Sequence, residues 1–285
     1  MDERFPFPIC YLCFNMNEAQ IEPFYFGEPD KSLFGIYHAP SSHNCRKSGI
    51  VLCYPIGQEY IRSHRSFFQL ALRLSKNGFH VLRFDYYGTG DSNGTCEEGG
   101  IEHWIKDIDA AIGELRKIAH LDQLHLVGCR IGATLAIKAA VKRSNAVDSL
   151  VLWSPIINGL KYHKELVHLH EGHVNSYVEN EPNKGITQCE ILGFQYSESL
   201  VKDLRAINLI DLCNKLFLKN LLIIENKNAK KSDTLMEAFG GFCENLEHKI
   251  IPSPDVWIKD GNLNKGMVPL PIIQYVVSQL SKLSE

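Results

Sequence analysis

The chain lacks the features of several large protein classes. Its 285 residues carry a formal net charge of only −3, and lysine and arginine do not cluster among aromatic residues. We therefore expect no nucleic-acid binding. No apolar run approaches the roughly 18 residues needed to span a bilayer. The first residues have neither the basic end nor the apolar centre of a secretion signal, so we expect a cytoplasmic protein without a membrane span.

The sequence also lacks a recognisable disulfide framework or metal-binding pattern. Its nine cysteines are an odd number scattered along the chain, which favours reduced thiols. The one close pair, Cys10 and Cys13, has no second pair to complete a zinc site, and we interpret both as free thiols in an N-terminal strand. His168, His170 and His173 do not share one face at helical or strand spacing. We expect no metal and no cofactor.

Apolar periodicity predicts alternating strands and helices. Residues 24–27 and 32–38 form an expected antiparallel hairpin. Short buried runs that read as strands then alternate with amphipathic segments that read as helices: strands at 49–54, 80–84, 124–127 and 149–153, and helices at 67–76, 101–119 and 133–140. This alternation predicts an α/β fold with a mostly parallel central sheet flanked by helices.

The alternation breaks after Trp153. Residues 155–216 are polar and rich in histidine, with one helix expected at 197–212. The pattern then resumes with a strand at 221–224, a helix at 234–242, a strand at 248–251 and a closing helix at 271–283. We therefore expect a core formed by residues 1–154 and 219–285, with an inserted cap at 155–218.

The stretch Leu124–Ala133 has the framing of a nucleophile elbow. Gly128 and Gly132 lie two residues before and two after the central position, where they allow a tight turn from strand to helix. That central position is Arg130. A guanidinium stays protonated at ordinary pH and cannot attack a carbonyl as serine or cysteine does.

The element order resembles the α/β-hydrolase fold over nearly the whole chain. Segments 55–65 and 83–94 are similar to the serine aminopeptidase-like branch and its exosortase A system-associated hydrolases. The Gly-Cys-Arg-Ile-Gly-Ala elbow and segment 251–257 resemble one subgroup of those hydrolases. The resemblance implies genes for acyl activation and carrier proteins nearby, and hence an acyl substrate.

In such a fold the backbone supplies an oxyanion hole. We expect one N–H from Ile56 or Gly57, in the turn after the strand at 49–54, and another from Ile131, directly after the elbow residue. Backbone donors survive any change of side chain. The hole is therefore expected to persist without the nucleophile.

Two roles are open for Arg130. Beside these donors and a helix N-terminus it suits a carboxylate, a phosphate or a polarised thioester carbonyl. Alternatively it points into the cap and pairs internally with a carboxylate such as Glu59 or Asp255. Both of these carboxylates are also candidate general bases.

The other triad positions are altered as well. A hydrolase needs a carboxylate after the strand at 221–224 and a histidine after the last strand. The first position offers Asn228, with Glu225 as a closer-lying substitute. At the second no histidine follows: His248 is expected to precede its strand, and Asp255 lies nearest.

Cys129 gives one further alternative. A thiolate beside Arg130 and a helix end would have a lowered pKa and act as a nucleophile. Its side chain is expected to point away from the apex, where it would be a small buried hydrophobe.

These observations predict a protein that binds an acyl or aminoacyl (thio)ester, either free or on a carrier protein, and assists acyl transfer without a covalent intermediate. One alternative is a non-catalytic partner of an acyl ligase or carrier protein. Another is an esterase or thioesterase that uses Cys129.

Overall fold

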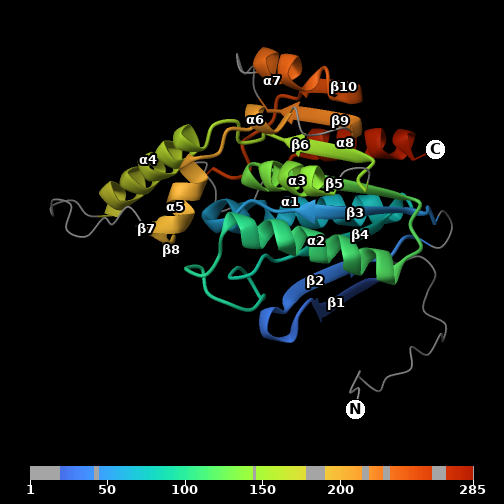
Figure 1. Ribbon diagram of the computed structural model, residues 1–285, viewed down its shortest axis with the longest axis horizontal. Coiled ribbons are helices and arrows are strands. Elements are labelled where there is room, and N and C mark those ends of the chain that lie inside the picture. Colours follow the sequence, from blue (N-terminus) through green and yellow to red (C-terminus); the bar gives the residue numbers. More distant parts are fainter. Residues whose placement is uncertain are drawn as a thin grey trace.

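The computed structural model describes residues 20–41, 45–143, 146–177, 190–213, 218–226, 232–258 and 268–284 (Figure 1). Its centre is an eight-stranded sheet in the order β1-β2-β4-β3-β5-β6-β9-β10. The strands are β1 (Ile21–Phe26), β2 (Leu33–His38), β3 (Ser48–Cys53), β4 (His80–Phe84), β5 (Gln123–Cys129), β6 (Ser149–Trp153), β9 (Leu218–Glu225) and β10 (Cys243–Ile250). β2 is antiparallel to β1 and β4, and all other neighbours are parallel, which confirms the predicted fold class.

Helices cover both faces of the sheet, which is why β3 and β6 are buried along their whole length. α2 (Ile101–Ile118) packs against α3 (Ile131–Lys142) on one face, and α1 (Gly57–Lys76) packs against α8 (Leu270–Leu283) on the other (Figure 1). α7 (Ser232–Phe239) packs beside β10 at the edge. Because the parallel strands share one direction, the loops after β3, β5, β6 and β9 meet at one end of the sheet.

The helix expected at 67–76 begins ten residues earlier, at Gly57. The face that this first half turns toward the core carries Glu59, Ser63 and Ser66, all buried. Apolar periodicity starts only at Phe67, so the prediction of its start was wrong for a physical reason: the buried face there is polar.

The chain between Trp153 and Leu218, which we call the inserted segment, leaves the sheet after β6. Its elements are α4 (Gly159–Tyr177), a short hairpin of β7 (Glu190–Ile191) and β8 (Phe194–Gln195), α5 (Glu198–Arg205) and α6 (Ile210–Cys213). α4 packs against α5 and β7, and these elements lie at one end of the molecule (Figure 1). The cap at 155–218 as a separate unit stays a prediction.

The single helix expected at 197–212 is two helices. Between α5 and α6, the Ile207 carbonyl accepts the Gly159 N–H, and the Leu209 N–H donates to Ile157. These hydrogen bonds tie the loop to the chain that leaves β6, so its backbone cannot continue a helix.

His248 lies inside β10 and does not precede it, which corrects the prediction. β10 is an edge strand with the sequence CENLEHKI, and its exposure alternates along the strand. The strand contains no apolar run and is interrupted by Glu244, Asn245 and Glu247, so its first five residues carried little strand signal.

Candidate active site at the turn after β5

The strand-to-helix turn has the strained geometry of an elbow. Arg130 lies between β5 and α3 with φ 53° and ψ −123°, which a residue with a side chain rarely adopts. Its N–H donates to the Trp153 carbonyl at 3.0 Å. A Cβ at Gly128 would collide with Ala133, and one at Gly132 would collide with the backbone oxygens at the end of β3. Both glycines are therefore required by close backbone approach, as the sequence predicted.

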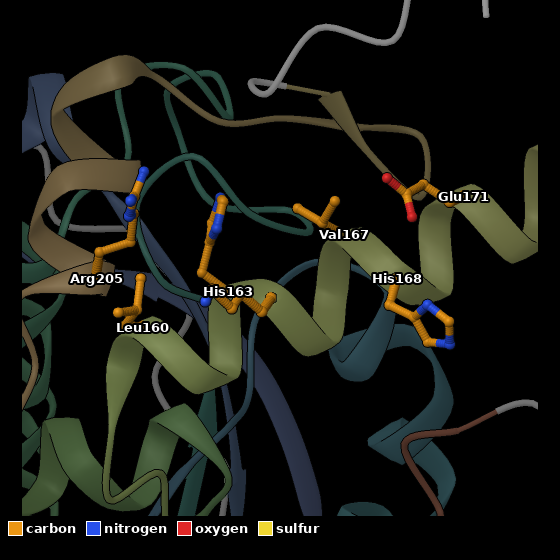
Figure 2. Close-up of a pocket in the computed structure, with 7 residues that line it drawn as sticks. Leu160, His163, Val167, His168, Glu171 and Arg205 are labelled. Carbon is orange, nitrogen blue, oxygen red and sulfur yellow. The ribbon is translucent and has the colours of Figure 1, made fainter.

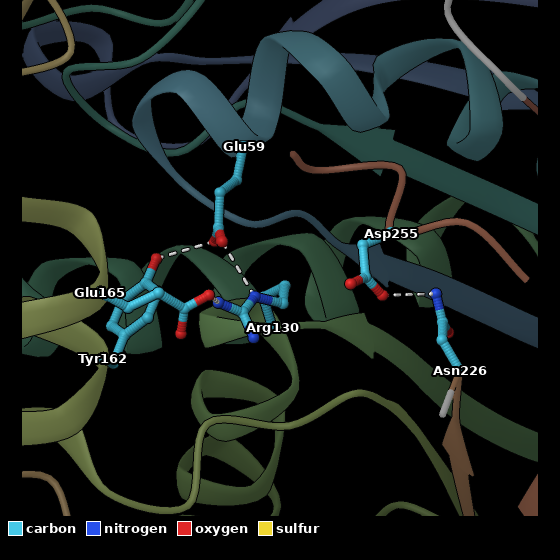
Figure 3. A network of polar contacts seen from close by, with 6 residues as sticks. All are labelled: Glu59, Arg130, Tyr162, Glu165, Asn226 and Asp255. Carbon is cyan, nitrogen blue, oxygen red and sulfur yellow. Dashed lines mark hydrogen bonds and ion pairs between the residues drawn. The ribbon is translucent and has the colours of Figure 1, made fainter. Parts of the chain in front are cut away.

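The Arg130 side chain is buried among carboxylates and rings (Figure 3). Its Nε donates to Glu59 on α1 at 2.8 Å, and one Nη donates to Glu165 on α4 at 2.8 Å. The guanidinium carbon lies 5.3 Å from the ring centre of Tyr162 and 5.1 Å from that of Trp257. Of the two roles considered for Arg130, contact with a ligand or an ion pair within the protein, the structure has the ion pair, with Glu59 as the buried partner.

Glu59 joins α1 to both the elbow and the inserted segment. Its second oxygen accepts the Tyr162 hydroxyl at 2.8 Å, and its side chain is only 4% exposed. Burial raises the pKa of Glu59, while Arg130 and the Tyr162 hydroxyl oppose that rise. Burial alone would lower the pKa of Arg130, but Glu59, Tyr162 and Glu165 more than offset it, and the net pKa is raised. We therefore treat Arg130 as a permanent cation.

The expected oxyanion donors lie at adjacent helix starts. Ile56 precedes α1 and Gly57 is its first residue, with φ 57°, while Ile131 is the first residue of α3. First-turn N–H groups have no acceptor within their own helix. The Tyr196 hydroxyl lies directly against Gly57, where an added Cβ would meet it. A hole formed by these three residues stays a prediction, and Tyr196 is the group that covers one of them.

Cys129 does not have the environment of a nucleophile. Its side chain is fully buried, and burial raises the pKa of its thiol well above the usual value. A reactive thiol needs exposure and a lowered pKa. This environment is that of a small buried hydrophobe, and a nucleophilic role for Cys129 stays an untested prediction.

Of the two candidate acid positions, the structure describes Glu225. Glu225 accepts a hydrogen bond from His248 Nε2 on β10 at 2.9 Å. Asn228 lies outside the described residues, as do Cys10 and Cys13. The polar residue that reaches the site from the end of β9 is Asn226, whose amide donates to the Pro254 carbonyl and to Asp255.

Asn226 also accepts the Trp153 indole N–H at 2.8 Å, so it joins β6, β9 and the loop after β10. Figure 3 shows Asn226 and Asp255 on one side of Arg130, with Glu59, Tyr162 and Glu165 on the other. Asp255 is half-buried. The loop after β10 therefore brings a carboxylate, where a hydrolase has histidine, close to the elbow.

Sequence reasoning missed Asn226, Tyr162, Glu165 and Tyr196. Tyr162 and Glu165 are three residues apart, which places them on one face of a helix, and this spacing was the sequence signal that could have paired them. Within the described residues no group of three or more histidine, cysteine or acidic side chains is arranged to hold a metal ion. His170 instead accepts the Leu192 N–H. No described helix is long and apolar enough to cross a membrane.

Comparisons with known proteins bear on the fold of the chain. The family model described as serine aminopeptidase, S33, matches residues 60–185. Palmitoyl-protein thioesterase ABHD10, mitochondrial, of Bos taurus is 35% identical over 83 residues, which are 29% of this chain and 26% of that protein. Lysophosphatidylserine lipase ABHD12 of Xenopus tropicalis is 32% identical over 118 residues, 38% of this chain and 28% of that protein. The chain thus spans about a quarter of the curated relatives it matches.

Solved structures match over nearly the full length. The Pyrococcus furiosus esterase Pf2001 has a TM-score of 0.64 at 17% identity, covering 94% of this chain and 92% of its own. Proline iminopeptidase of Mycobacterium smegmatis has a TM-score of 0.63 at 12% identity, covering 92% and 98%. At these identities the likeness shows the fold alone.

Proposed function

We propose, on the basis that the chain is an α/β-hydrolase-fold protein, that it binds an acyl or aminoacyl (thio)ester at the turn after β5 without forming an acyl-enzyme. One observation carries the proposal: the position of the nucleophile holds an arginine whose guanidinium is buried between Glu59 and Glu165. An arginine cannot form an acyl-enzyme. The nearest thiol, Cys129, is fully buried.

Backbone N–H groups and the similar proteins both support an acyl compound as the ligand. Gly57 and Ile131 place N–H groups at two helix starts, which suits a polarised carbonyl oxygen. A palmitoyl-protein thioesterase and a lysophosphatidylserine lipase are among the similar proteins. Arg130, Tyr162 and Tyr196 are all less than one-tenth exposed, so ligand entry requires the inserted segment to move.

Direct acyl transfer is the catalytic form of this proposal. An amine would attack the bound thioester carbonyl, forming the C–N bond, and the C–S bond would break to release a thiolate. The amine proton would pass to Asp255 or Glu59 and from there to the thiolate, which leaves as the thiol. Asp255 is the better placed of the two, because it is half-buried whereas Glu59 is buried and held by Arg130 and Tyr162.

A non-catalytic partner of an acyl ligase or carrier protein is the second candidate. The ion pairs of Arg130 favour it, since a guanidinium already neutralised by two carboxylates adds little to the polarisation of a carbonyl. Co-purification with a co-encoded ligase or carrier protein, together with no turnover of thioesters with or without amines, would select this candidate over acyl transfer.

Equilibrium binding of a non-cleavable acyl thioether analogue tests the proposal. We expect saturable binding to the wild-type protein and binding at least about tenfold weaker, or 1.4 kcal/mol, in Glu59→Gln, since Glu59 holds Arg130 and Tyr162 in place. Glu225→Gln is the matched control: it also removes a buried, hydrogen-bonded carboxylate, but at the β9–β10 edge. Equal weakening in both variants, or no saturable binding, would overturn the proposal.

We also propose that the protein works in the cytoplasm, because Cys45, Cys53, Cys96, Cys129 and Cys243 are free thiols, as expected of a reducing compartment. Fractionation of the native cells would test this. Recovery from the mitochondrial matrix, also reducing and the compartment in the name of the ABHD10 relatives, would contradict it.

A further inference from the structure

α4 has a second functional face. Tyr162 and Glu165 point toward the elbow, whereas Leu160, His163, Val167 and Glu171 recur every three or four residues on another face. Together with Lys164 and with Arg205 at the end of α5, this face lines a groove of about 240 Å³ (Figure 2). We call it the α4–α5 groove. It is separate from the contacts of Arg130.

His163 gives the groove an unused donor or acceptor. The residue is only 6% exposed, and its Nε2 is shielded from solvent with no hydrogen-bond partner within the described part of the chain. Leaving such a group unpaired is unfavourable, and a ligand that pairs with it removes that cost. Burial lowers the pKa of His163, and Arg205 lowers it further. A neutral imidazole still carries one N–H that can donate to an anion.

The charge at this end of the groove is positive. Arg205 is exposed, and Figure 2 shows its side chain beside the His163 ring. Among the described residues, no carboxylate forms an ion pair with Arg205 or Lys164. Glu171 is the one acidic residue of the lining, and it lies two turns further along α4 from His163. A negative ligand group is therefore favoured next to Arg205 and His163.

We propose that the α4–α5 groove binds an organic phosphate. Arg205 donates to two phosphate oxygens, the His163 ring donates a third hydrogen bond, and Lys164 adds charge. The groove is larger than a phosphate ion needs, and Leu160 and Val167 provide apolar surface for a carbon chain on the ester oxygen. Such binding requires the imidazole or the exposed Arg205 side chain to rotate so that both donors face one phosphate.

Isothermal titration calorimetry with inorganic phosphate and with n-butyl phosphate tests the proposal. We expect both to bind and the butyl ester to bind more tightly. Arg205→Gln should weaken both by about 10- to 100-fold, the value of a charged hydrogen bond of about 1.5–3 kcal/mol. Lys202→Gln, an exposed cation on the same helix but outside the groove lining, is the matched control and should bind normally.

Two results would overturn the proposal: no saturable binding of either probe, or equal weakening in Arg205→Gln and Lys202→Gln, which would indicate non-specific charge. Equal affinity for the two probes would overturn the organic ester and leave a site for the ion alone. Because His163→Gln risks unfolding, the role of His163 is better read from the ¹⁵N chemical shifts of its ring. We expect them to move on binding, and unchanged shifts would exclude His163 from the site.

Discussion

Replacing Glu59 by glutamine tests the network around Arg130. The substitution keeps the size of the side chain but removes the charge that pairs with the buried guanidinium at 2.8 Å. Arg130 would then keep only Glu165, whose side chain is 41% exposed. Removing one partner of a buried ion pair costs about 3–5 kcal/mol. That is a large part of the roughly 5–15 kcal/mol by which folded domains are stable.

Glu165→Gln is the comparison, because it removes the other carboxylate on the same guanidinium. Because the Glu165 side chain is 41% exposed, its ion pair resembles a surface ion pair, which contributes about 0.2–1 kcal/mol to the free energy of unfolding. Tyr162→Phe removes one hydrogen bond to the Glu59 carboxylate and should cost about 1.5–3 kcal/mol. The expected order of destabilisation is therefore Glu59→Gln, then Tyr162→Phe, then Glu165→Gln.

Urea unfolding followed by tryptophan fluorescence measures these differences, with a shift of midpoint at constant slope reporting stability. A double-mutant cycle with Arg130→Met measures the coupling of the pair, because methionine keeps an unbranched side chain at φ 53° and removes the guanidinium with its charge and its hydrogen-bond donors. We expect the double variant to be more stable than either single variant, since neither charge is left alone. Additive losses, or equal losses in Glu59→Gln and Glu165→Gln, would refute the reasoning.

Three further predictions follow from single positions. Gly132→Ala should lower the free energy of unfolding by about 1–3 kcal/mol, because the added Cβ meets backbone oxygens at the end of β3. Gly113→Ala, where nothing lies within 4 Å of the added Cβ, should raise it by about 0.5–1 kcal/mol. Thermal unfolding measures both, and equal effects would contradict this. Iodoacetamide should label exposed Cys96 in the folded protein and spare Cys129, and rapid labelling of Cys129 would reverse our account of it. Burial lowers the pKa of His125 from 6.5 to about 4. Between these two pH values the unfolded chain binds a proton at His125 that the folded chain does not. Stability should therefore fall as pH drops from about 6.5 to about 4, by at most ~1.4 kcal/mol per pH unit. His125→Gln should lose that share of the slope, and an unchanged slope would show that His125 does not cause it.

The elbow could be predicted from sequence because its signals are local. Gly128 and Gly132 flank one residue at the end of a buried strand, and the geometry follows from close backbone approach at those two positions. β6 was likewise predicted with its observed bounds, because all five of its residues are buried. Short-range patterns of this kind need no knowledge of the rest of the fold.

The sequence alone could not decide which residues pair with Arg130. Glu59 lies 71 residues away in sequence, on a helix turn whose buried face is polar, so its burial makes sense only once Arg130 is opposite. Asn226 follows β9 into the site, whereas the sequence pointed to Asn228, which lies outside the described residues; a shift of one or two residues decides which side chain leaves a strand in a given direction. Tyr196 reaches Gly57 from a part of the inserted segment that carries no periodic signal.

Native mass spectrometry of the protein mixed with an acyl N-acetylcysteamine thioester tests the central claim most directly, because one spectrum separates a non-covalent complex from an acyl-enzyme. We expect a species whose mass is that of the protein plus the intact thioester, lost on denaturation. A species that has gained only the acyl group, with release of the thiol, and that survives denaturation would contradict the account.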